Sequence, residues 1–431
     1  MKGISRRAVL KTLSAGAAAA AAGPLAGTAG AQQGNAPDRL PTFTGPGANP
    51  YWGNVGPVAT YPQKVPLLLL TDRPVQLETP RYFFQTPFTP NGAFYVRWHL
   101  DDIPNTVDLG EWRLEISGNV EKPAKYTFDA LLNSLPATTV AAVNQCSGNS
   151  RSRFQPRVAG GQWGNGAMGN ALWKGVRLAD VLAGAGVKAG SVEVQFQGLD
   201  RGKGPEGRGS NAFLKSLEVS NPVLKECILA YEMNGEPLPM LNGFPVRLVV
   251  PGYFATYWVK ALTNIRVLEK PDENFWMKTG YRIPDTARGT TTPAEVKAGT
   301  VKTVPIGRMP VRSFIITPDG ETKVPMGMTV NVRGIAFSGE GRVTRVEVSE
   351  DDAKSWLPAK LGEDLGAYSF RMWEFAWKPR RAGLHVLAVR ATDEKGNVQP
   401  DEGVWNPGGY LWNRIERQHV MVGTENAGGG R

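Results

Sequence analysis

The chain has 431 residues, of which 41% are hydrophobic and 20% are charged, and its formal net charge is +10 at pH 7. The length predicts two domains. The Lys and Arg residues are scattered among acidic ones without a basic helix or arm, so we expect no nucleic acid as a partner. The positive net charge instead favours an anionic substrate or an acidic partner. With two Cys and three His, the chain has neither a zinc-site spacing nor the Cys-x-x-Cys-His motif of covalently bound haem.

Residues 1–31 are predicted to be a twin-arginine signal peptide. Arg6 and Arg7 form the twin arginine, an alanine-rich apolar stretch follows, and residues 29–31 (AGA) are small enough for cleavage. The apolar stretch is short and contains Pro24, so a membrane-anchoring helix is the less favoured alternative. This route exports folded proteins, which suits a cofactor inserted before export. We therefore expect the mature chain in the periplasm, without a membrane span.

The next segment, residues 32–67, is rich in Gly, Pro, Asn and Gln and is predicted to be an extended arm. A mixed α/β domain is predicted from 68 to 285. Its aromatic strand at 94–100 places Arg97 and His99 on one face, which is either a solvated face or an anion contact. A further strand is predicted at 112–116, and a helix is predicted to start at Thr127 and to carry apolar residues at helical spacing, namely Phe128, Leu131, Leu132 and Leu135.

The stretch 143–151 (VNQCSGNSR) is centred on Cys146. Apolar residues 138–143 predict a buried strand, and Gly148 predicts a turn at its end, where the sites of mixed folds tend to lie. A thiol in the positive field of nearby arginines is a good nucleophile or soft metal ligand. A lone Cys is more often a small buried hydrophobe, but these neighbours favour Cys146 as the reactive centre over that alternative and over a disulfide with Cys227.

Residues 160–170 form a glycine-rich loop that has neither the Lys-Ser/Thr end of a phosphate loop nor a dinucleotide-site spacing. This loop allows either a close approach to a bulky ligand or an irregular connection. Beyond it we predict a short helix at 178–182, a strand at 192–196 that ends at 198–200, and a buried strand at 245–250.

Between 286 and 304 the composition turns to Thr, Pro, Ala, Gly and Lys without periodicity, which predicts a linker. Short strands separated by turns are then predicted at 311–317, 329–336, 342–349, 369–375 and 384–392. This spacing predicts an antiparallel immunoglobulin-like β-sandwich over 305–423, followed by a tail at 424–431. The predicted fold class is thus α+β, with a mixed α/β domain followed by this sandwich.

Three motifs resemble, in order, the signatures of the sulfite oxidase family of molybdenum enzymes. They are FYVRWHL at 94–100, NQCSGN at 144–149 with an arginine five residues beyond the cysteine, and NGEPLP at 234–239 followed by GFPVRLVVPG at 243–252. The resemblance extends over nearly all of the mature chain, and the terminal sandwich matches the dimerisation domain of that family. One departure is Asn242, at a position where the family often has His.

The resemblance implies a molybdenum–molybdopterin cofactor, with Cys146 as the metal ligand. It also implies that Arg97 and Arg151 bind the oxyanion through their guanidinium forks, that Tyr281 forms hydrogen bonds near the metal, and that Arg371 reaches the substrate from the second domain. Contacts to the pterin or its phosphate are implied for a further set of residues: Tyr95, His99, Asp200, Arg247 and Lys260.

Together with the export signal, the resemblance implies a periplasmic sulfite dehydrogenase. Such an enzyme oxidises sulfite, or another small sulfur oxyanion, by oxygen-atom transfer at molybdenum and passes electrons to a c-type cytochrome, which in some cases is a tight subunit. A homodimer or heteromer is expected. One alternative is the sulfane dehydrogenase subunit of a thiosulfate-oxidising complex, which acts on protein-bound sulfur. An alternative of another class is an exported non-enzymatic binding protein with a structural cysteine.

Overall fold

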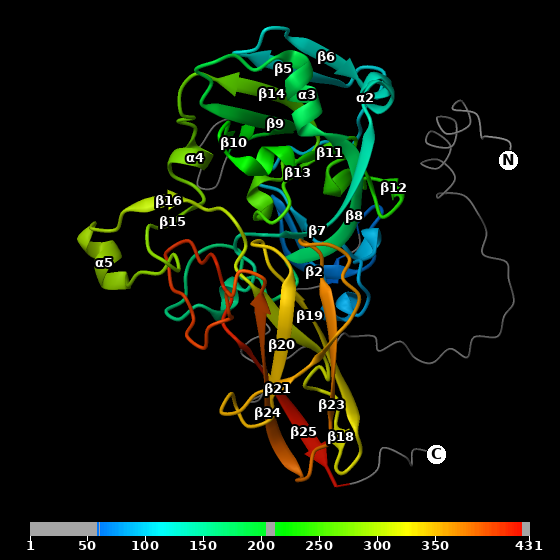
Figure 1. The fold of residues 1–431 in the computed structure, drawn as a ribbon, viewed down its shortest axis with the longest axis vertical. Helices are drawn as coiled ribbons and strands as arrows, with labels where there is room; N and C mark the ends of the chain where they lie inside the picture. The colour runs from blue at the N-terminus through cyan, green and yellow to red at the C-terminus, as the bar shows by residue number, and fades with distance from the viewer. Residues whose placement is uncertain (1–57, 60, 204–211, 425–431) are drawn as a thin grey trace, which may run out of the picture. The chain divides into compact units, whose positions relative to one another are not determined.

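The computed structural model describes residues 58–59, 61–203 and 212–424. The predicted signal peptide, most of the predicted arm and all of the predicted tail except residue 424 lie outside these residues. The described chain is mostly strands with few, short helices (Figure 1): α2 Phe128–Ser134, α3 Leu178–Ala185, α4 Phe275–Lys278 and α5 Pro293–Ala298. None of the helices in these residues is long and apolar enough to cross a bilayer.

Sheets dominate the part of the chain before residue 300. One sheet has the order β1–β2–β3–β4, with bounds Val58–Ala59, Leu67–Asp72, Val75–Glu78 and Val96–Arg97. A second has the order β10–β9–β14–β5–β6 (Figure 1), with bounds Ala212–Glu218, Glu193–Arg201, Leu262–Leu268, Arg113–Gly118 and Ala124–Thr127. A third has the order β12–β11–β8–β7, and β13 also pairs with β11; the bounds are Glu236–Pro237, Ile228–Met233, Met168–Arg177, Ala137–Gln145 and Arg247–Val249.

Single turns of 3₁₀ helix connect these strands. Their bounds are Arg81–Phe84, Asn91–Ala93, Arg151–Arg153, Pro222–Lys225, Met240–Asn242 and Ala255–Tyr257. The predicted helix cap at Thr127 is confirmed, because its side chain accepts a hydrogen bond from the backbone N–H of Ala130 at 3.1 Å.

Strand β7 delivers Cys146 to the interior. The strand is partly exposed at its start and fully buried over its last residues, and it pairs antiparallel with β8 from Ala137–Val176 to Gln145–Met168. The next residue, Cys146, donates its N–H to the carbonyl of Ala167 at 2.9 Å. The predicted buried strand before Cys146 is therefore confirmed, and the glycine-rich loop lies directly beside the cysteine.

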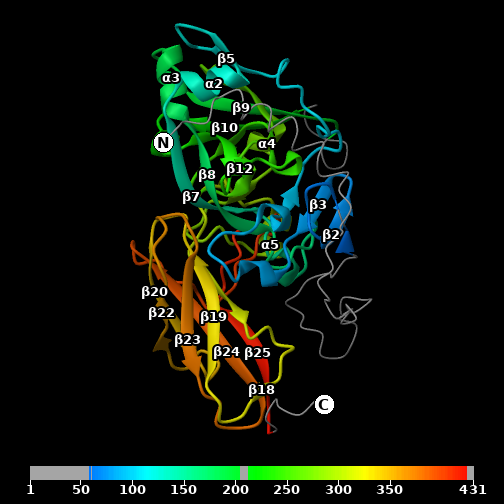
Figure 2. The ribbon, with the colours of Figure 1, turned by 90° about the vertical axis from the view of Figure 1, so that its right-hand side faces the viewer.

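The C-terminal strands form two sheets that share one apolar core (Figure 2). One has the order β17–β19–β23–β22, with bounds Arg312–Thr317, Val330–Phe337, Arg371–Trp377 and Lys360–Leu361. The other has the order β18–β25–β24–β20–β21, with bounds Val324–Pro325, Glu416–Gly423, Gly383–Asp393, Val343–Ser349 and Leu357–Pro358. The five strands predicted here are confirmed within about two residues, whereas the immunoglobulin-like topology stays a prediction.

Two predicted segments differ from the structure. The strand expected over 94–100 is limited to β4, so His99 lies beyond it and shares no strand face with Arg97. The segment predicted as a linker carries α5 and reaches strand β16, Thr303–Pro305, which pairs with β15, Arg282–Pro284. Helix α5 begins in a capping box, in which Thr292 and Glu295 each accept a hydrogen bond from the other's backbone N–H.

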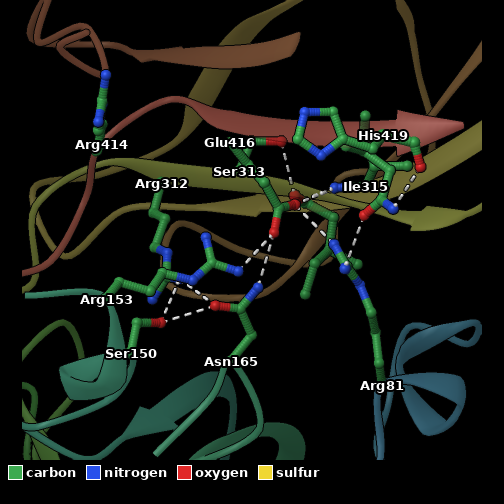
Figure 3. Close-up of polar contacts among 12 residues, drawn as sticks. Arg81, Ser150, Arg153, Asn165, Arg312, Ser313, Ile315, Arg414, Glu416 and His419 are labelled. Atoms are coloured by element: carbon green, nitrogen blue, oxygen red, sulfur yellow. Dashed lines mark hydrogen bonds and ion pairs between the residues drawn. The ribbon is translucent and has the colours of Figure 1, made fainter. Parts of the chain in front are cut away.

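Buried ionic contacts link the C-terminal sheets to the rest of the chain (Figure 3). Glu416, the first residue of β25, forms ion pairs with Arg81 at 2.6 Å and with Arg153 at 2.9 Å, and all three side chains are less than 10% exposed. The backbone N–H of Ile315 donates to the same carboxylate at 2.9 Å. Because a buried charge is stable only when it is paired and hydrogen-bonded, this carboxylate fixes where the two parts of the chain meet.

Acid is expected to destabilise the protein through Glu416. Burial alone would raise the pKa of Glu416, but Arg81 and Arg153 outweigh it and lower the pKa from 4.5 to about 2. The stabilisation, roughly 3 kcal/mol from a shift of this size, is fully present above pH 4.5 and is lost as the pH falls towards 2. We expect the unfolding midpoints of the parent and Glu416→Gln proteins to differ at pH 7 and to converge as the pH falls from 4.5 towards 2. Glu374→Gln, which breaks an exposed ion pair with Lys360, serves as the control. A difference between the unfolding midpoints of the parent and Glu416→Gln that does not change with pH would contradict the prediction.

Candidate active site

A pocket of about 410 Å³, open solvent at its mouth included, lies where β4 and β7 end and β13 begins. Seven of the residues predicted for the site line it: Tyr95, Arg97, His99, Cys146, Arg247, Lys260 and Tyr281. Three cationic side chains and no carboxylate belong to the described lining, which is completed by Asn144, Ser147, Leu241, Asn242, Ala255 and Thr256. Such a lining favours an anionic ligand.

Cys146 lies in this pocket at the end of β7 and is 8% exposed. Its carbonyl accepts a hydrogen bond from the N–H of Asn149 at 3.0 Å, which closes the turn predicted after the strand. Both cysteines are free, so the disulfide that was the less favoured alternative is absent, and burial raises the pKa of Cys227 above its usual range. Cys227 thus behaves as a core residue, while Cys146 faces a cavity.

His99 and Tyr281 contact each other through the imidazole Nε2 and the phenol hydroxyl. Burial, assisted by Arg97, holds the pKa of His99 well below its ordinary value, so the ring is neutral at neutral pH. Burial likewise raises the pKa of Tyr281, so its hydroxyl keeps its proton. The imidazole stacks on the ring of Phe213 at 3.7 Å, which fixes its plane. The pair therefore presents a neutral, oriented hydroxyl to the pocket.

Lys260, which lines the pocket, and Asp200, which does not, are both buried and interact electrostatically. The Lys260 ammonium donates to the carbonyl of Arg97 at 2.8 Å and lies 4.4 Å above the ring of Trp98. Burial lowers the pKa of Lys260 and raises that of Asp200, and each charge favours the ionised form of the other. Asp200 lies in β9, outside the pocket lining, so its contact with a ligand would be indirect, through Lys260.

Two predicted arginines do not line the pocket. Arg151 donates from Nε and Nη2 to the carbonyl of Gly408 at 3.1 and 3.0 Å, and from Nη1 to that of Gly161 at 3.1 Å. Arg371 lies at the start of β23, where its guanidinium pairs with Asp364 at 3.0 Å. The structure therefore brings Arg97, but not Arg151 or Arg371, into the lining around Cys146.

Two side chains near the pocket, Lys64 and Tyr410, were missed in the sequence. Lys64 contacts the Asn242 amide oxygen through its amino group, and burial followed by the charge of Arg247 lowers the pKa of Lys64 to about 7. Lys64 therefore supplies a buried hydrogen-bond donor next to Asn242. The ring of Tyr410 stacks on that of Tyr281 at 5.6 Å. Neither residue belongs to a periodic pattern, and no local signal marks them.

Two protein families match the chain, and both are families of molybdenum oxidoreductases. Residues 99–276 match the oxidoreductase molybdopterin binding domain family, and residues 303–422 match the Mo-co oxidoreductase dimerisation domain family. The chain is 36% identical over 386 residues to mitochondrial sulfite oxidase of Homo sapiens, covering 85% of this chain and 68% of the human protein. It is 32% identical over 384 residues to the sulfite oxidase of Arabidopsis thaliana, covering 82% of this chain and 94% of the plant protein.

A solved structure is similar over nearly the whole length. The sulfane dehydrogenase SoxCD from Paracoccus pantotrophus matches with a TM-score of 0.70 and 25% sequence identity, covering 92% of this chain and 95% of that chain. The chain belongs to the sulfite oxidase family, and its cofactor is molybdenum–molybdopterin. Its C-terminal part is the dimerisation domain of these enzymes, which indicates a dimer.

The pocket fits this cofactor. Four buried polar atoms of lining residues have no hydrogen-bond partner within the described part of the chain: Asn144 Nδ2, Ser147 Oγ, Arg247 Nε and Thr256 Oγ1. A heterocycle rich in nitrogen and oxygen with a phosphate group would satisfy them. The described residues contain no group of three His, Cys, Asp or Glu side chains suited to a metal. Cys146 is thus a lone soft ligand, which suits a metal that receives its other ligands from the cofactor.

Proposed function

We propose that the protein oxidises sulfite to sulfate and passes the electrons to a c-type cytochrome. The observation that carries this proposal is that Cys146, Arg97 and Tyr281 line one pocket whose described lining has cations and no carboxylate. When bound, the molybdenum centre supplies a two-electron acceptor and an oxygen atom for the sulfur. Cys146 is the side chain that would hold the metal, and Arg247 and Lys260 would contact the pterin phosphate.

The side chains of the chain would bind and orient the substrate. Arg97 provides a fixed, permanently charged fork that matches the oxygens of a sulfur oxyanion. Tyr281, kept protonated by burial and held by His99, would direct its hydroxyl towards an oxygen of the same anion. Such preorganised donors are worth about 10²–10³ in rate each, because a site shielded from water does not reorganise during the reaction.

Sulfite-dependent reduction of cytochrome c by the cofactor-loaded protein tests this function. We expect two molecules of cytochrome c to be reduced for each sulfite, since oxidation to sulfate releases two electrons. The molybdenum content is measured on the same sample. A protein that contains molybdenum but gives no reduction with sulfite would contradict the proposal.

A second candidate is a sulfane dehydrogenase that acts on protein-bound sulfur. It is supported by the similarity to SoxCD over 92% of the chain. It is also supported by Arg151, which is committed to backbone carbonyls, so that only Arg97 of the two arginines expected to bind the oxyanion lines the pocket. The same assay with a sulfur-loaded carrier protein in place of sulfite distinguishes the two. The family assignment leaves the alternative of a non-enzymatic binding protein without support.

We further propose that the protein acts in the periplasm. The twin arginine at Arg6 and Arg7 supports this location, and fractionation of cells that produce the protein tests it. A separate or tightly bound cytochrome is the proposed electron acceptor, and the mass of the purified complex distinguishes a homodimer from a heteromer.

A further inference from the structure

We propose that Arg312, from the C-terminal domain, is a positioning residue for the Cys146 loop, which we define as residues 146–151. Arg312 begins β17 and is 2% exposed. It contacts neither the pocket nor Cys146. Its position behind the loop nevertheless determines, through a short series of hydrogen bonds, where the cysteine lies. The inference rests on the proposed function, in which Cys146 is the metal ligand.

The Arg312 guanidinium joins the Cys146 loop to the glycine-rich segment (Figure 3). Its Nη2 donates to Ser150 Oγ and to Asn165 Oδ1, both at 2.7 Å. The Ser150 hydroxyl in turn donates to Asn165 Oδ1 at 2.7 Å. One charged group from the C-terminal domain therefore holds one residue of each segment.

Asn165 is fixed from several sides, so it transmits this contact rigidly. Its Nδ2 donates to Glu416 at 2.9 Å, and its backbone carbonyl accepts from the side chain of Asn149 at 3.2 Å. The backbone N–H groups on either side of it, those of Gly164 and Gly166, both donate to the buried carboxylate of Glu78 at 2.8 Å. Gly166 has no room for a side chain, because an added Cβ would lie 2.0 Å from the carbonyl of Thr79.

Ser150 connects this network to Cys146 within four residues. Its backbone is in the left-handed region, with φ 67° and ψ 24°, a conformation that non-glycine residues keep only when their surroundings enforce it. Its N–H donates to the carbonyl of Gly164 at 2.6 Å. The preceding residue, Asn149, donates its N–H to the Cys146 carbonyl and accepts from the N–H of Ala167 at 3.0 Å each. A shift of Ser150 must therefore move Cys146.

A stabilising role alone does not explain a buried guanidinium at this place. Within the described residues its hydrogen bonds go to the neutral side chains of Ser150 and Asn165. An apolar residue of similar size would avoid the cost of burying a charge. What the guanidinium adds is direction, since its planar Nη2 amino group fixes both acceptors in one geometry. Catalytic groups tolerate errors of only about 0.5 Å, and supporting side chains are what hold them there.

The test uses the purified holoenzyme and the Arg312→Met substitution. We expect kcat to fall about 10- to 100-fold, as for other small misplacements of a reacting group, while KM changes less than twofold because Arg97 is untouched. The thiolate-to-molybdenum charge-transfer absorption band should shift or weaken, which a purely structural role would not cause in protein that remains folded. Arg312→Lys keeps the charge and one of the two contacts and should restore part of both signals.

The matched control is Arg390→Met. It removes a partly buried ion pair with Glu347 and a cation–π contact with Trp356, both within the same domain. Ser150→Ala removes only the bridging hydroxyl and decides the question if Arg312→Met does not fold. If Arg312→Met shows the same absorption band and the same kcat as the control, the proposal is overturned. If Arg312→Met does not fold, the same result for Ser150→Ala overturns it. A band that persists in Cys146→Ser would instead refute Cys146 as the ligand, and the positioning role with it.

Discussion

Replacing Cys146 by Ser is expected to lower the rate of sulfite oxidation by more than about 100-fold, since loss of partners outside the ligand shell already costs 10- to 100-fold in metal sites. Serine is nearly the same size, so the pocket and its cationic lining are retained. Its hydroxyl is a hard donor that stays protonated at neutral pH, and it cannot replace a thiolate as a ligand for a metal that changes oxidation state. Sulfite-dependent cytochrome c reduction, expressed per molybdenum, measures the loss.

The matched control for this substitution is Cys227→Ser. This substitution also replaces a sulfur atom by oxygen, but Cys227 is fully buried and does not line the pocket. Its substitution should lower the thermal unfolding midpoint, because a polar hydroxyl is placed in the core. The rate per molybdenum should stay within about twofold of the parent rate, because the pocket is unchanged. Equal activity of the two variants would show that Cys146 has no role at the metal.

Replacing Arg97 by Met is expected to lower kcat/KM for sulfite by about 100-fold, which corresponds to roughly 3 kcal/mol of lost transition-state stabilisation. Arg97 and Arg247 are the arginines that line the pocket with Cys146. Arg97 is the one proposed to meet the substrate, because Arg247 would contact the pterin phosphate and Arg151 is bound to backbone carbonyls. Most of the loss should appear as a higher KM, since the guanidinium meets the anion already in the bound state. Steady-state kinetics over a range of sulfite concentrations separates the two parameters.

Two further variants make this result specific. Arg97→Lys keeps the charge but not the planar fork, so its loss should be intermediate. Arg266→Met removes an exposed arginine of β14 and changes the net charge equally, so it reveals any effect of overall charge on the approach of the anion. An Arg97→Met protein with unchanged kcat/KM would exclude a substrate contact at this position and would favour an uncharged or protein-bound substrate.

Local patterns in the sequence predicted several strands and the position of Cys146 after one of them. Apolar residues before Cys146 predicted β7, and short segments separated by turns predicted five strands of the C-terminal sheets. Helix α5 was missed although Thr292 and Glu295 mark its start. It buries none of its residues, so it carries no apolar period, and a capping signal alone did not reveal it.

Long-range contacts could not be predicted in the same way. Lys64 and Asn242 are 178 residues apart, and Arg312 and Ser150 are 162 residues apart. In the sequence Arg312 and Glu416 are ordinary polar residues of β-strands, where a charge usually faces solvent. Their burial follows from the meeting of two domains, which depends on packing and not on any local pattern.

The ionic contacts of Glu416 also bear on the order of events as the protein is made. Cys146 leaves the ribosome well before Glu416, and the strand that carries Glu416 pairs with β24. Early segments of a chain generally fold first during synthesis, yet here the support behind the cysteine arrives only with β25. A nascent chain that ends before β25 has Cys146, the proposed metal ligand, but not its finished surroundings. Maturation of the site around Cys146 is thereby coupled to completion of the polypeptide.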